Sequence, residues 1–314
     1  MKKKKKMSRP EEIAPPELFY NSKESKKYTE NSRVQYIQYV MTKRSLELLN
    51  LKKSSFILDI GCGSCLSGEI ISSATEEVNQ GMNHYWTGLD ISPDMLEQAI
   101  IRKEEQKFNT NDDDSDDEES GDVGGLRNGD MMLHDMGQGI PFRAGSFDAA
   151  ISISAIQWLF NKDNNNQDPI KRIRRFFESL YSSLTKNGKF VAQFYPANDD
   201  QIDTFLQIAK QTGFSGGLVI DNPESKKNKK YYLVLSCGTM SSNDADDADN
   251  LNLSGAAMDA SNIHDKKDIK KKRGNGMLES KKSFILRKKE LMKKRGREVR
   301  GDSKYTGRKR RDRF

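Results

Sequence analysis

Three aspartates each fall at the end of a short apolar run that predicts a β-strand. Asp59, Asp90 and Asp135 belong to the runs 56–60, 85–90 and 130–135. Because the carboxyl ends of parallel strands meet at one edge of a sheet, we expect the three carboxylates to line a common rim. There they could accept hydrogen bonds from hydroxyl and amine groups of a ligand. The alternative is that each aspartate only caps a helix or forms a turn.

Two closely spaced glycines, Gly61 and Gly63, follow the first of these strands, and the segment 66–73 after them has helical character. Strand, glycine turn and helix together predict a nucleotide-type pocket. A dinucleotide fingerprint would need glycine at position 66, where Leu66 stands, which disfavours NAD. An acid two residues before the first glycine instead matches D/E-x-G-x-G-x-G, the motif of S-adenosylmethionine (SAM) methyltransferases, with Cys65 in place of the third glycine. A plain glycine turn remains the alternative.

The SAM interpretation gives each acid a separate contact. Asp90 would accept both ribose hydroxyl groups, Asp59 would hold the cationic methionyl end partly through water, and Asp135 would lie near the adenine amine. SAM would be the methyl donor and S-adenosylhomocysteine the product. The predicted cofactor-binding residues are Asp59, Gly61, Cys62, Gly63, Asp90, Ile91, Asp135, Met136 and Ser152.

Strands and helices alternate along the chain. Helices are expected at 28–51, 66–73, 168–184 and 202–212, and another begins after Ser92, a candidate N-cap that precedes Pro93. Strands are expected at 56–60, 85–90, 130–135, 147–153, 189–195, 217–221 and 231–236, the last two as a hairpin. This order predicts an α/β doubly wound, Rossmann-like sheet of seven strands with the last one antiparallel, the class I methyltransferase arrangement.

Composition divides the chain into four parts. Hydrophobic residues make up 34% and charged residues 32%, so part of the chain is expected to be unpacked. We expect an N-terminal arm at 1–27, mobile through residue 17, and a methyltransferase domain at 28–238 with an acidic disordered insertion at 109–125. A linker at 239–265 and a basic tail at 266–314, disordered or helical, would follow. No apolar run approaches the roughly 20 residues that span a bilayer, so no membrane association is expected.

Charge is concentrated at the C-terminal end. Residues 266–314 hold 22 Lys/Arg against 6 Asp/Glu, a net charge of +16, so the remainder of this +7 chain carries −9. Most of that deficit lies in the eight carboxylates of 112–122. Attraction for a polyanion is therefore expected to come mainly from the tail. Cys62 and Cys65 form a C-x-x-C pair, but with no second pair nearby we expect no metal site, and a redox role stays an alternative.

Absent motifs restrict the methyl acceptor. The chain has no Asn/Asp-Pro-Pro-Tyr/Phe segment after the fourth strand, where enzymes that methylate exocyclic amines often carry one. It also has no Pro-Cys nucleophile for pyrimidine carbons. These absences favour an acceptor with its own lone pair, such as guanine N7, and catalysis by proximity without a catalytic residue.

Aromatic residues at the ends of the fourth and fifth strands are candidates to stack an extruded base. The predicted substrate-binding residues are Gln157, Trp158, Tyr195 and Pro196. Core packing is the alternative for the aromatic residues, Phe194 above all.

Several segments together resemble the eukaryotic 18S rRNA (guanine-N7) methyltransferase family. They are Arg9–Glu11, Pro15–Tyr20, Asp59–Gly63, Gly88–Ser92, Asp135–Arg143, Ser154–Leu159, Gln193–Pro196 and Lys304–Arg310. The resemblance implies action on 18S rRNA in the pre-40S particle, in the nucleus and nucleolus with the cytoplasm as a further place. It also implies a small zinc-binding activator subunit as partner. Two rivals are a pre-rRNA-binding assembly factor whose methylation is dispensable and, less favoured, a SAM enzyme for small metabolites.

The activator is expected on the strand that contains Met131–Leu133, because the third strand is the outer edge of a class I sheet. Unpaired backbone groups beside adjacent apolar side chains need a cover. A partner strand would provide it, and the chain's own N-terminal arm is the alternative.

Overall fold

The computed structural model describes residues 9–73, 75–109, 126, 128–161, 168–225, 228–238 and 289. The chain forms two compact units, 1–261 and 262–314, and within the second unit the description is limited to Lys289. The predicted acidic insertion beyond residue 109, the linker and the rest of the basic tail therefore lie outside the described residues.

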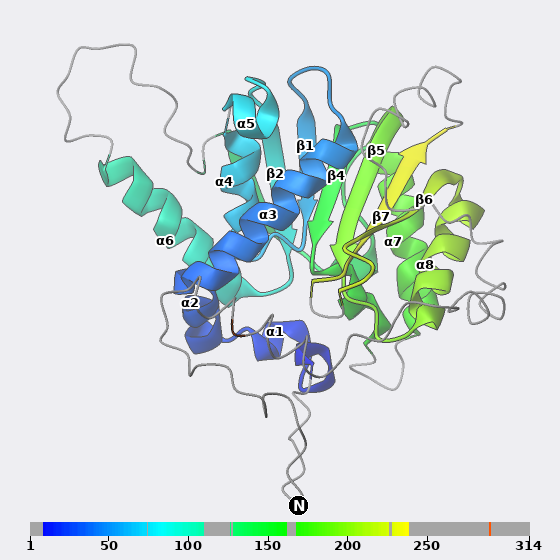
Figure 1. Ribbon diagram of the computed structural model, residues 1–314, viewed down its shortest axis with the longest axis horizontal. Helices are drawn as coiled ribbons and strands as arrows, with labels where there is room; N and C mark the ends of the chain where they lie inside the picture. The colour runs from blue at the N-terminus through cyan, green and yellow to red at the C-terminus, as the bar shows by residue number, and fades with distance from the viewer. Residues whose placement is uncertain are drawn as a thin grey trace, which may run out of the picture. The chain divides into compact units, whose positions relative to one another are not determined.

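Seven strands form one sheet in the order β3-β2-β1-β4-β5-β7-β6 (Figure 1). They are β1 (Phe56–Ile60), β2 (Tyr85–Asp90), β3 (Gly129–Leu133), β4 (Phe147–Ile153), β5 (Leu184–Phe194), β6 (Phe214–Asp221) and β7 (Lys230–Cys237). The first five pair in parallel, whereas β7 pairs antiparallel with both β5 and β6. The predicted class I arrangement and the final hairpin are confirmed.

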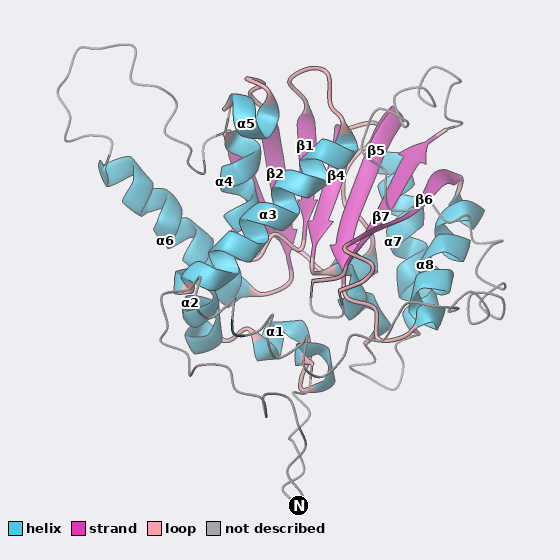
Figure 2. Ribbon diagram, viewed as in Figure 1, coloured by secondary structure: helices cyan, strands magenta, loops and turns pink. Residues whose placement is uncertain are grey.

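Helices cover both faces of the sheet (Figure 2). They are α1 (Pro16–Phe19), α2 (Ser22–Glu30), α3 (Ser32–Leu49), α4 (Leu66–Ser72), α5 (Glu76–Asn79), α6 (Pro93–Asn109), α7 (Pro169–Ser183) and α8 (Asp199–Thr212), with 3-10 turns η1 (Pro10–Glu12), η2 (Met136–Gln138) and η3 (Ile156–Phe160). Successive strand residues point to opposite faces. In β1, Ile57 joins the core on the α3 and α4 side, while Leu58 and Ile60 join the core on the α7 and α8 side.

The N-terminal region differs from prediction in two ways. The helix expected over 28–51 is two helices, because the side chain of Asn31 accepts hydrogen bonds from the N–H groups of Arg33 and Val34 and starts α3. The expectation of a mobile arm through residue 17 is wrong for residues 9–17. They contribute η1 and α1, and with α2 these elements lie below the carboxyl ends of the strands in Figure 1.

β3 is the outer edge of the sheet, as predicted. Its two methionines, however, are partly buried: Met131 packs against one core and Met132 against the other. Leu133 is the exposed apolar side chain of this strand, 57% accessible. The expected pair of uncovered methionines is therefore wrong, and the exposed apolar group lies one residue later.

Candidate active site

The glycine turn between β1 and α4 is fastened to the end of β2. The N–H groups of Gly61 and Cys62 both donate to the carbonyl of Leu89, at 2.7 and 3.0 Å. Gly61 has a φ of +75°, and a Cβ there would lie 2.2 Å from the Cβ of Ala155. Cys65, at the third glycine position of the motif, has a φ of +58°. The chain thus keeps a left-handed residue at that position without glycine.

Asp90 joins the glycine turn to the start of α6. Its Oδ2 accepts from the N–H of Gly63 and its Oδ1 from the N–H of Ser92, both at 2.8 Å. Ser92 caps α6 as predicted, because its Oγ accepts from the N–H of Met95 at 3.2 Å. Burial raises the pKa of Asp90, while its backbone hydrogen bonds oppose that rise. A carboxylate oxygen can accept more than one hydrogen bond, so both oxygens of Asp90 can also accept hydrogen bonds from ligand hydroxyl groups.

Asp59 is buried in β1 beneath the glycine turn and is 1% exposed. Its Oδ2 accepts from the Oγ of Ser67 at 2.5 Å, and its Oδ1 has no hydrogen-bond partner in the described structure. Burial raises the pKa of Asp59 to about 7, against the effect of the Ser67 hydrogen bond and with a smaller contribution from Asp90. A buried carboxylate with an unmet oxygen is costly, so this group suits a cationic ligand.

Asp135, just beyond β3, is held by Arg172 of α7, a residue that sequence analysis did not select. Its Oδ1 lies 3.0 Å from Nη2 of Arg172 and accepts from the N–H of Gly137 at 2.8 Å. A Cβ on Gly137 would lie 2.3 Å from Nε of Arg172. Glycine at this position therefore admits the guanidinium, and the ion pair fixes the orientation of the Asp135 carboxylate.

These groups surround a cavity of about 470 Å³, within the roughly 300–1,000 Å³ of small-molecule sites. The predicted residues that line it are Gly61, Cys62, Gly63, Asp90, Ile91, Asp135, Met136, Gln157, Trp158 and Tyr195.

Three predicted residues are not part of the cavity lining. Asp59 lies behind Ser67, which does line it. Ser152 is fully buried and donates from its Oγ to the carbonyl of Ile60 at 2.7 Å, so it joins β4 to β1. Pro196 presents its carbonyl to Arg9 at 3.0 Å. A direct ligand contact is therefore not supported for these three side chains, and Asp59 could act on a cationic ligand only across Ser67 or through water.

A buried polar network lies where β4 and β5 reach the cavity. Ser154 has a φ of +59°, and its Oγ donates to the Oε1 of Gln193 at 2.6 Å. The carbonyl of Ser154 accepts from Nε2 of Gln157 at 2.7 Å, which leaves Oε1 of Gln157 without a partner among the described residues. Left-handed backbone at a non-glycine residue is often found at functional sites. The network supports the predicted role of Gln157 at the acceptor.

Residues 9–30, which we call the N-terminal cover, form one wall of the cavity. The ring of Tyr20 lies 6.1 Å from that of Trp158 and 5.9 Å from that of Tyr28, centroid to centroid. The carbonyl of Tyr20 accepts from the Oγ of Ser92 at 3.0 Å. Burial raises the pKa of both tyrosines, so they stay neutral near pH 7.

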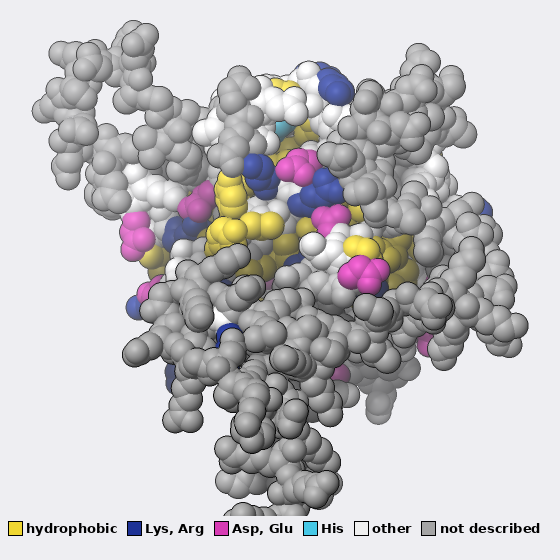
Figure 3. Space-filling model, in the orientation of Figure 1, with side chains coloured by type: hydrophobic (Ala, Val, Ile, Leu, Met, Phe, Trp, Pro, Cys, Tyr) yellow, Lys and Arg dark blue, Asp and Glu magenta, His cyan; other side chains and the backbone are white. Residues whose placement is uncertain are grey.

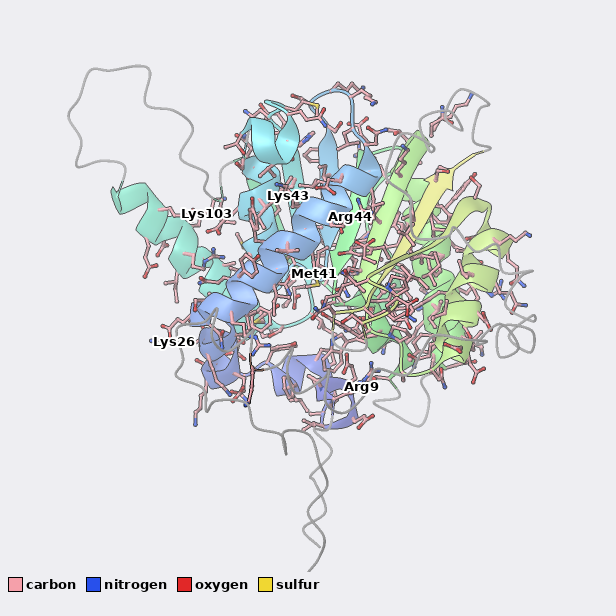
Figure 4. The ribbon with its side chains drawn as sticks, in the orientation of Figure 1. Arg9, Lys26, Met41, Lys43, Arg44 and Lys103 are labelled. Atoms are coloured by element: carbon pink, nitrogen blue, oxygen red, sulfur yellow. The ribbon has the colours of Figure 1, made fainter. Side chains whose placement is uncertain are left out.

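Arg9 attaches the beginning of the cover to the end of β5. Its Nη2 donates to the carbonyls of Tyr195 and Pro196 at 3.1 and 3.0 Å. Figure 4 shows Arg9 next to α1, and it labels Met41 separately on α3. Sequence analysis missed the cover as part of the site. The signal was the aromatic content of Phe19, Tyr20 and Tyr28 in a segment otherwise rich in charge.

The cavity residues fit SAM. Asp59 offers a buried, partly unsatisfied carboxyl for a cationic group, Asp90 has acceptor capacity for hydroxyl groups, and the glycine turn permits close backbone approach. SAM, when bound, supplies a methyl group on a positively charged sulfur. In the described part of the chain, no group of three or more His, Cys, Asp or Glu could hold a metal ion.

Among the described residues at the acceptor end, one imidazole and one carboxylate are already engaged in other bonds. His134 shares a 2.6 Å hydrogen bond through Nε2 with the carbonyl of Gly139, and Asp135 is paired with Arg172. The engagement of these two groups favours a methyl acceptor that brings its own lone pair. Fold and site together define a class I SAM-dependent methyltransferase.

Comparison with known proteins narrows the class. Residues 58–192 match the family model "Methyltransferase domain", and residues 235–312 match "Methyltransferase involved in Williams-Beuren syndrome". The chain is 58% identical to the 18S rRNA (guanine(1575)-N(7))-methyltransferase of Saccharomyces cerevisiae, over 98% of this chain and 100% of the relative. It is 42% identical to the 18S rRNA (guanine-N(7))-methyltransferase of Mus musculus, over 98% of each chain. A solved SAM-dependent methyltransferase from Aquifex aeolicus is 13% identical, with a TM-score of 0.46 over 69% of this chain and 98% of that one.

The chain belongs to the 18S rRNA (guanine-N7)-methyltransferase family. The predicted resemblance is confirmed over nearly its whole length. No helix among the described residues is long and apolar enough to cross a membrane.

Proposed function

We propose that this protein transfers the methyl group of SAM to N7 of a guanine in 18S rRNA, the reaction for which its relatives are named. The observation that carries the proposal is the 58% identity over nearly the full length. The cavity supports it, because its acceptor end has aromatic rings for stacking, while His134 and Asp135 are engaged in other bonds. Guanine N7 has a free lone pair, so proximity and in-line alignment with the sulfonium are sufficient.

The two ends of the cavity have separate tasks. Asp59 and Asp90 would orient the methionyl and ribose groups of SAM. Trp158 and Tyr195 would stack the guanine, and Gln157 would hydrogen-bond it. The ring of Tyr195 is held in place by Lys230 of β7, because its hydroxyl accepts a hydrogen bond from Nζ of Lys230 at 2.5 Å.

The direct test is a methyl-transfer assay on small-subunit rRNA from cells that lack this enzyme. The expected result is N7-methylguanine at one position, mapped by reduction and chain cleavage. Asp90→Ala, in which SAM binding should be strongly weakened, is the negative control and is assayed at a SAM concentration that saturates only the wild type. Methylation at another guanine atom or on ribose, or none with the partner subunit present, would contradict the proposal.

The basic tail supports a second, RNA-binding role in ribosome assembly. The family match over 235–312 includes the tail, which the +16 charge makes a strong attractor of phosphate. We propose that it anchors the enzyme to pre-rRNA and directs it to the nucleus and nucleolus. Deleting 266–314 should weaken rRNA binding and flatten its salt dependence. Unchanged affinity and salt slope would leave only the targeting role.

Whether methylation is needed for the assembly role can be tested separately. Asp90→Ala would replace the wild-type chain in living cells. Normal small-subunit maturation with this variant would make methylation dispensable, whereas arrested maturation would make it essential.

The outer edge of β3 supports the proposed docking of a small activator subunit. β3 is the outermost strand of the sheet, and Leu133 at its end is an exposed apolar side chain. An edge strand of this kind is a site where another chain can pair. Leu133→Lys should abolish copurification of the two proteins, while Met132→Lys should mainly lower stability because Met132 packs against the core. A complex that survives Leu133→Lys would place the activator elsewhere.

A further inference from the structure

Helix α7 carries a dense group of positive charges. Lys171, Arg172, Arg174 and Arg175 lie within five successive positions, and Glu178 is the one acid in the helix. Arg172 pairs with Asp135 in the cavity. The others lie on the exposed surface, which we call the basic face of α7 (Lys171, Arg174, Arg175).

Packing confines these charges to one side of α7. The buried side consists of Ile173, Phe176, Phe177, Leu180 and Ser183. On the exposed side, Arg174 donates from Nη2 to the Oε1 of Gln211 at 3.0 Å. Lys171 and Arg175 form no ion pair within the described structure. Their charges therefore remain available to an external anion.

Helix stability does not account for this placement. The N-terminal end of a helix is its positive pole, so cations there are unfavourable. Helix α8 follows the usual rule, with Asp199 and Asp200 in its first turn and Lys210 in its last. In α7 the acid at this end is the cap Asp168, whose side chain accepts from the N–H of Ile170 at 3.0 Å, and the first turn itself holds no acid. The three exposed cations of the basic face exceed the single charge of that cap, so the side chains favour an external anion along this end.

The position of α7 relates this charge to the cavity. Its N-terminal end follows η3, which contains Trp158, and Arg172 reaches from it into the cavity lining. Arg175 packs against Gly139 in the loop after η2: a Cβ added to Gly139 would lie 3.4 Å from the Cγ of Arg175. On the α3 side of the molecule, Figure 3 shows positive and negative side chains intermixed.

We propose that the basic face of α7 binds phosphates of the rRNA strand next to the guanine that enters the cavity. The inference rests on the proposed function and adds a second RNA contact to that of the tail. Phosphate contacts fix the register of a bound strand without reading its bases. The tail would thus attach the enzyme to RNA, and α7 would align the strand so that its target base reaches Trp158.

The test compares two double variants of the full-length chain. Lys171→Gln with Arg175→Gln removes two charges from the basic face. Lys52→Gln with Lys53→Gln removes two exposed charges from the loop between α3 and β1, at the amino end of that strand and thus opposite the carboxyl ends where the cavity lies. Affinity for a short 18S rRNA fragment containing the target guanine is measured at several salt concentrations, together with SAM affinity and thermal midpoint.

The α7 variant should bind the fragment about 10-fold more weakly and lose about 1.4–1.8 from its salt slope, as expected for two phosphate contacts. The control should lose less than about 2-fold, and neither should change SAM affinity. Equal losses in both variants, or none in the α7 variant, would overturn the inference. Wild-type methyl transfer to the same fragment is measured alongside, so failure of the proposed function would be recognised independently.

Discussion

The two halves of the cavity are built in different ways. In the SAM half, the glycine turn, Asp59 and Asp90 come from short segments joined to neighbouring strands, and backbone N–H groups hold the Asp90 carboxylate. In the acceptor half, Trp158 and Tyr195 meet the N-terminal cover, whose Arg9 lies 186 residues before Tyr195 in the chain.

The difference has energetic consequences. Groups in the SAM half are buried, so a change there exposes unmet hydrogen bonds or steric clashes that cost several kcal/mol in unfavourable cases. The hydrogen bonds of Arg9 are only partly buried, and each contributes on the order of 1 kcal/mol. We therefore expect the SAM half to be rigid and the acceptor half to open more easily. Four predictions test this, from the largest effect to the smallest.

Gly61→Ala should be the most damaging change. It combines a left-handed backbone, which costs about 1–2 kcal/mol for other residues, with overpacking of about 1–3 kcal/mol against Ala155. Urea denaturation should show a loss of roughly 2–5 kcal/mol, and calorimetry should show little SAM binding.

Gly145→Ala is the matched control. Gly145 has a similar φ of +66°, but nothing lies within 4 Å of the Cβ it would gain. The Gly145→Ala protein should lose only the free energy of unfolding due to the left-handed backbone, about 1–2 kcal/mol, and should keep full SAM affinity. Equal losses of stability in the two variants would mean that the clash with Ala155 relaxes freely.

Asp59→Asn should change how stability depends on pH. The pKa of Asp59 rises from 3.8 to about 7 on folding, so this residue favours the folded state most below pH 4 and loses that contribution as pH rises to about 7. Above pH 7 the ionised side chain costs up to about 4 kcal/mol. The variant should therefore match wild type near pH 4 and exceed it in stability near pH 8.

SAM should reverse part of this effect, because a cationic group near Asp59 favours its ionised form. Wild-type SAM affinity should rise with pH up to about 7, with proton release detected by calorimetry in buffers of different ionisation enthalpy. Asp59→Asn should show neither change. Identical pH profiles in the two proteins would show that Asp59 does not interact with the methionyl end of SAM.

Asp90→Ala should weaken SAM binding by about 2–3 kcal/mol, the range for losing charge-assisted hydrogen bonds. It also frees the N–H groups of Gly63 and Ser92. The control is Asp148→Ala, which removes a carboxylate that accepts from the N–H of Phe56 at 3.0 Å, away from the cavity. Unchanged SAM affinity in a folded Asp90→Ala protein would refute its assignment.

The contrast between the halves also explains what the sequence could predict. The glycine turn and Asp90 lie in local patterns whose backbone consequences are general, so their place on the rim was correctly predicted. The prediction that Ser152 binds the cofactor was wrong, because strand alternation does not tell whether Ser152 or Ile153 faces the cavity. The structure gives that position to Ile153.

The acceptor half depends on contacts between distant segments. Nothing in the pattern around Arg172 indicates that it pairs with Asp135, 37 positions earlier. The cap at Asn31 was not predicted, and the cover itself forms only when Tyr20 meets Trp158. Side-chain packing of this kind has no periodic signature in the sequence.

Arg9→Ala should have the smallest effect and should affect one half of the cavity. Loss of the bonds to Tyr195 and Pro196 should cost about 1–2 kcal/mol in attachment of the cover, with faster amide exchange over 16–30 and methyl transfer to RNA reduced about 5-fold. SAM affinity should stay within about 2-fold, since the SAM half keeps its own backbone hydrogen bonds. The control is Arg33→Ala, an exposed arginine near the start of α3. If Arg9→Ala weakened SAM binding as much as methyl transfer, the cover and the glycine turn would form one cooperative unit and the two halves would not be separable.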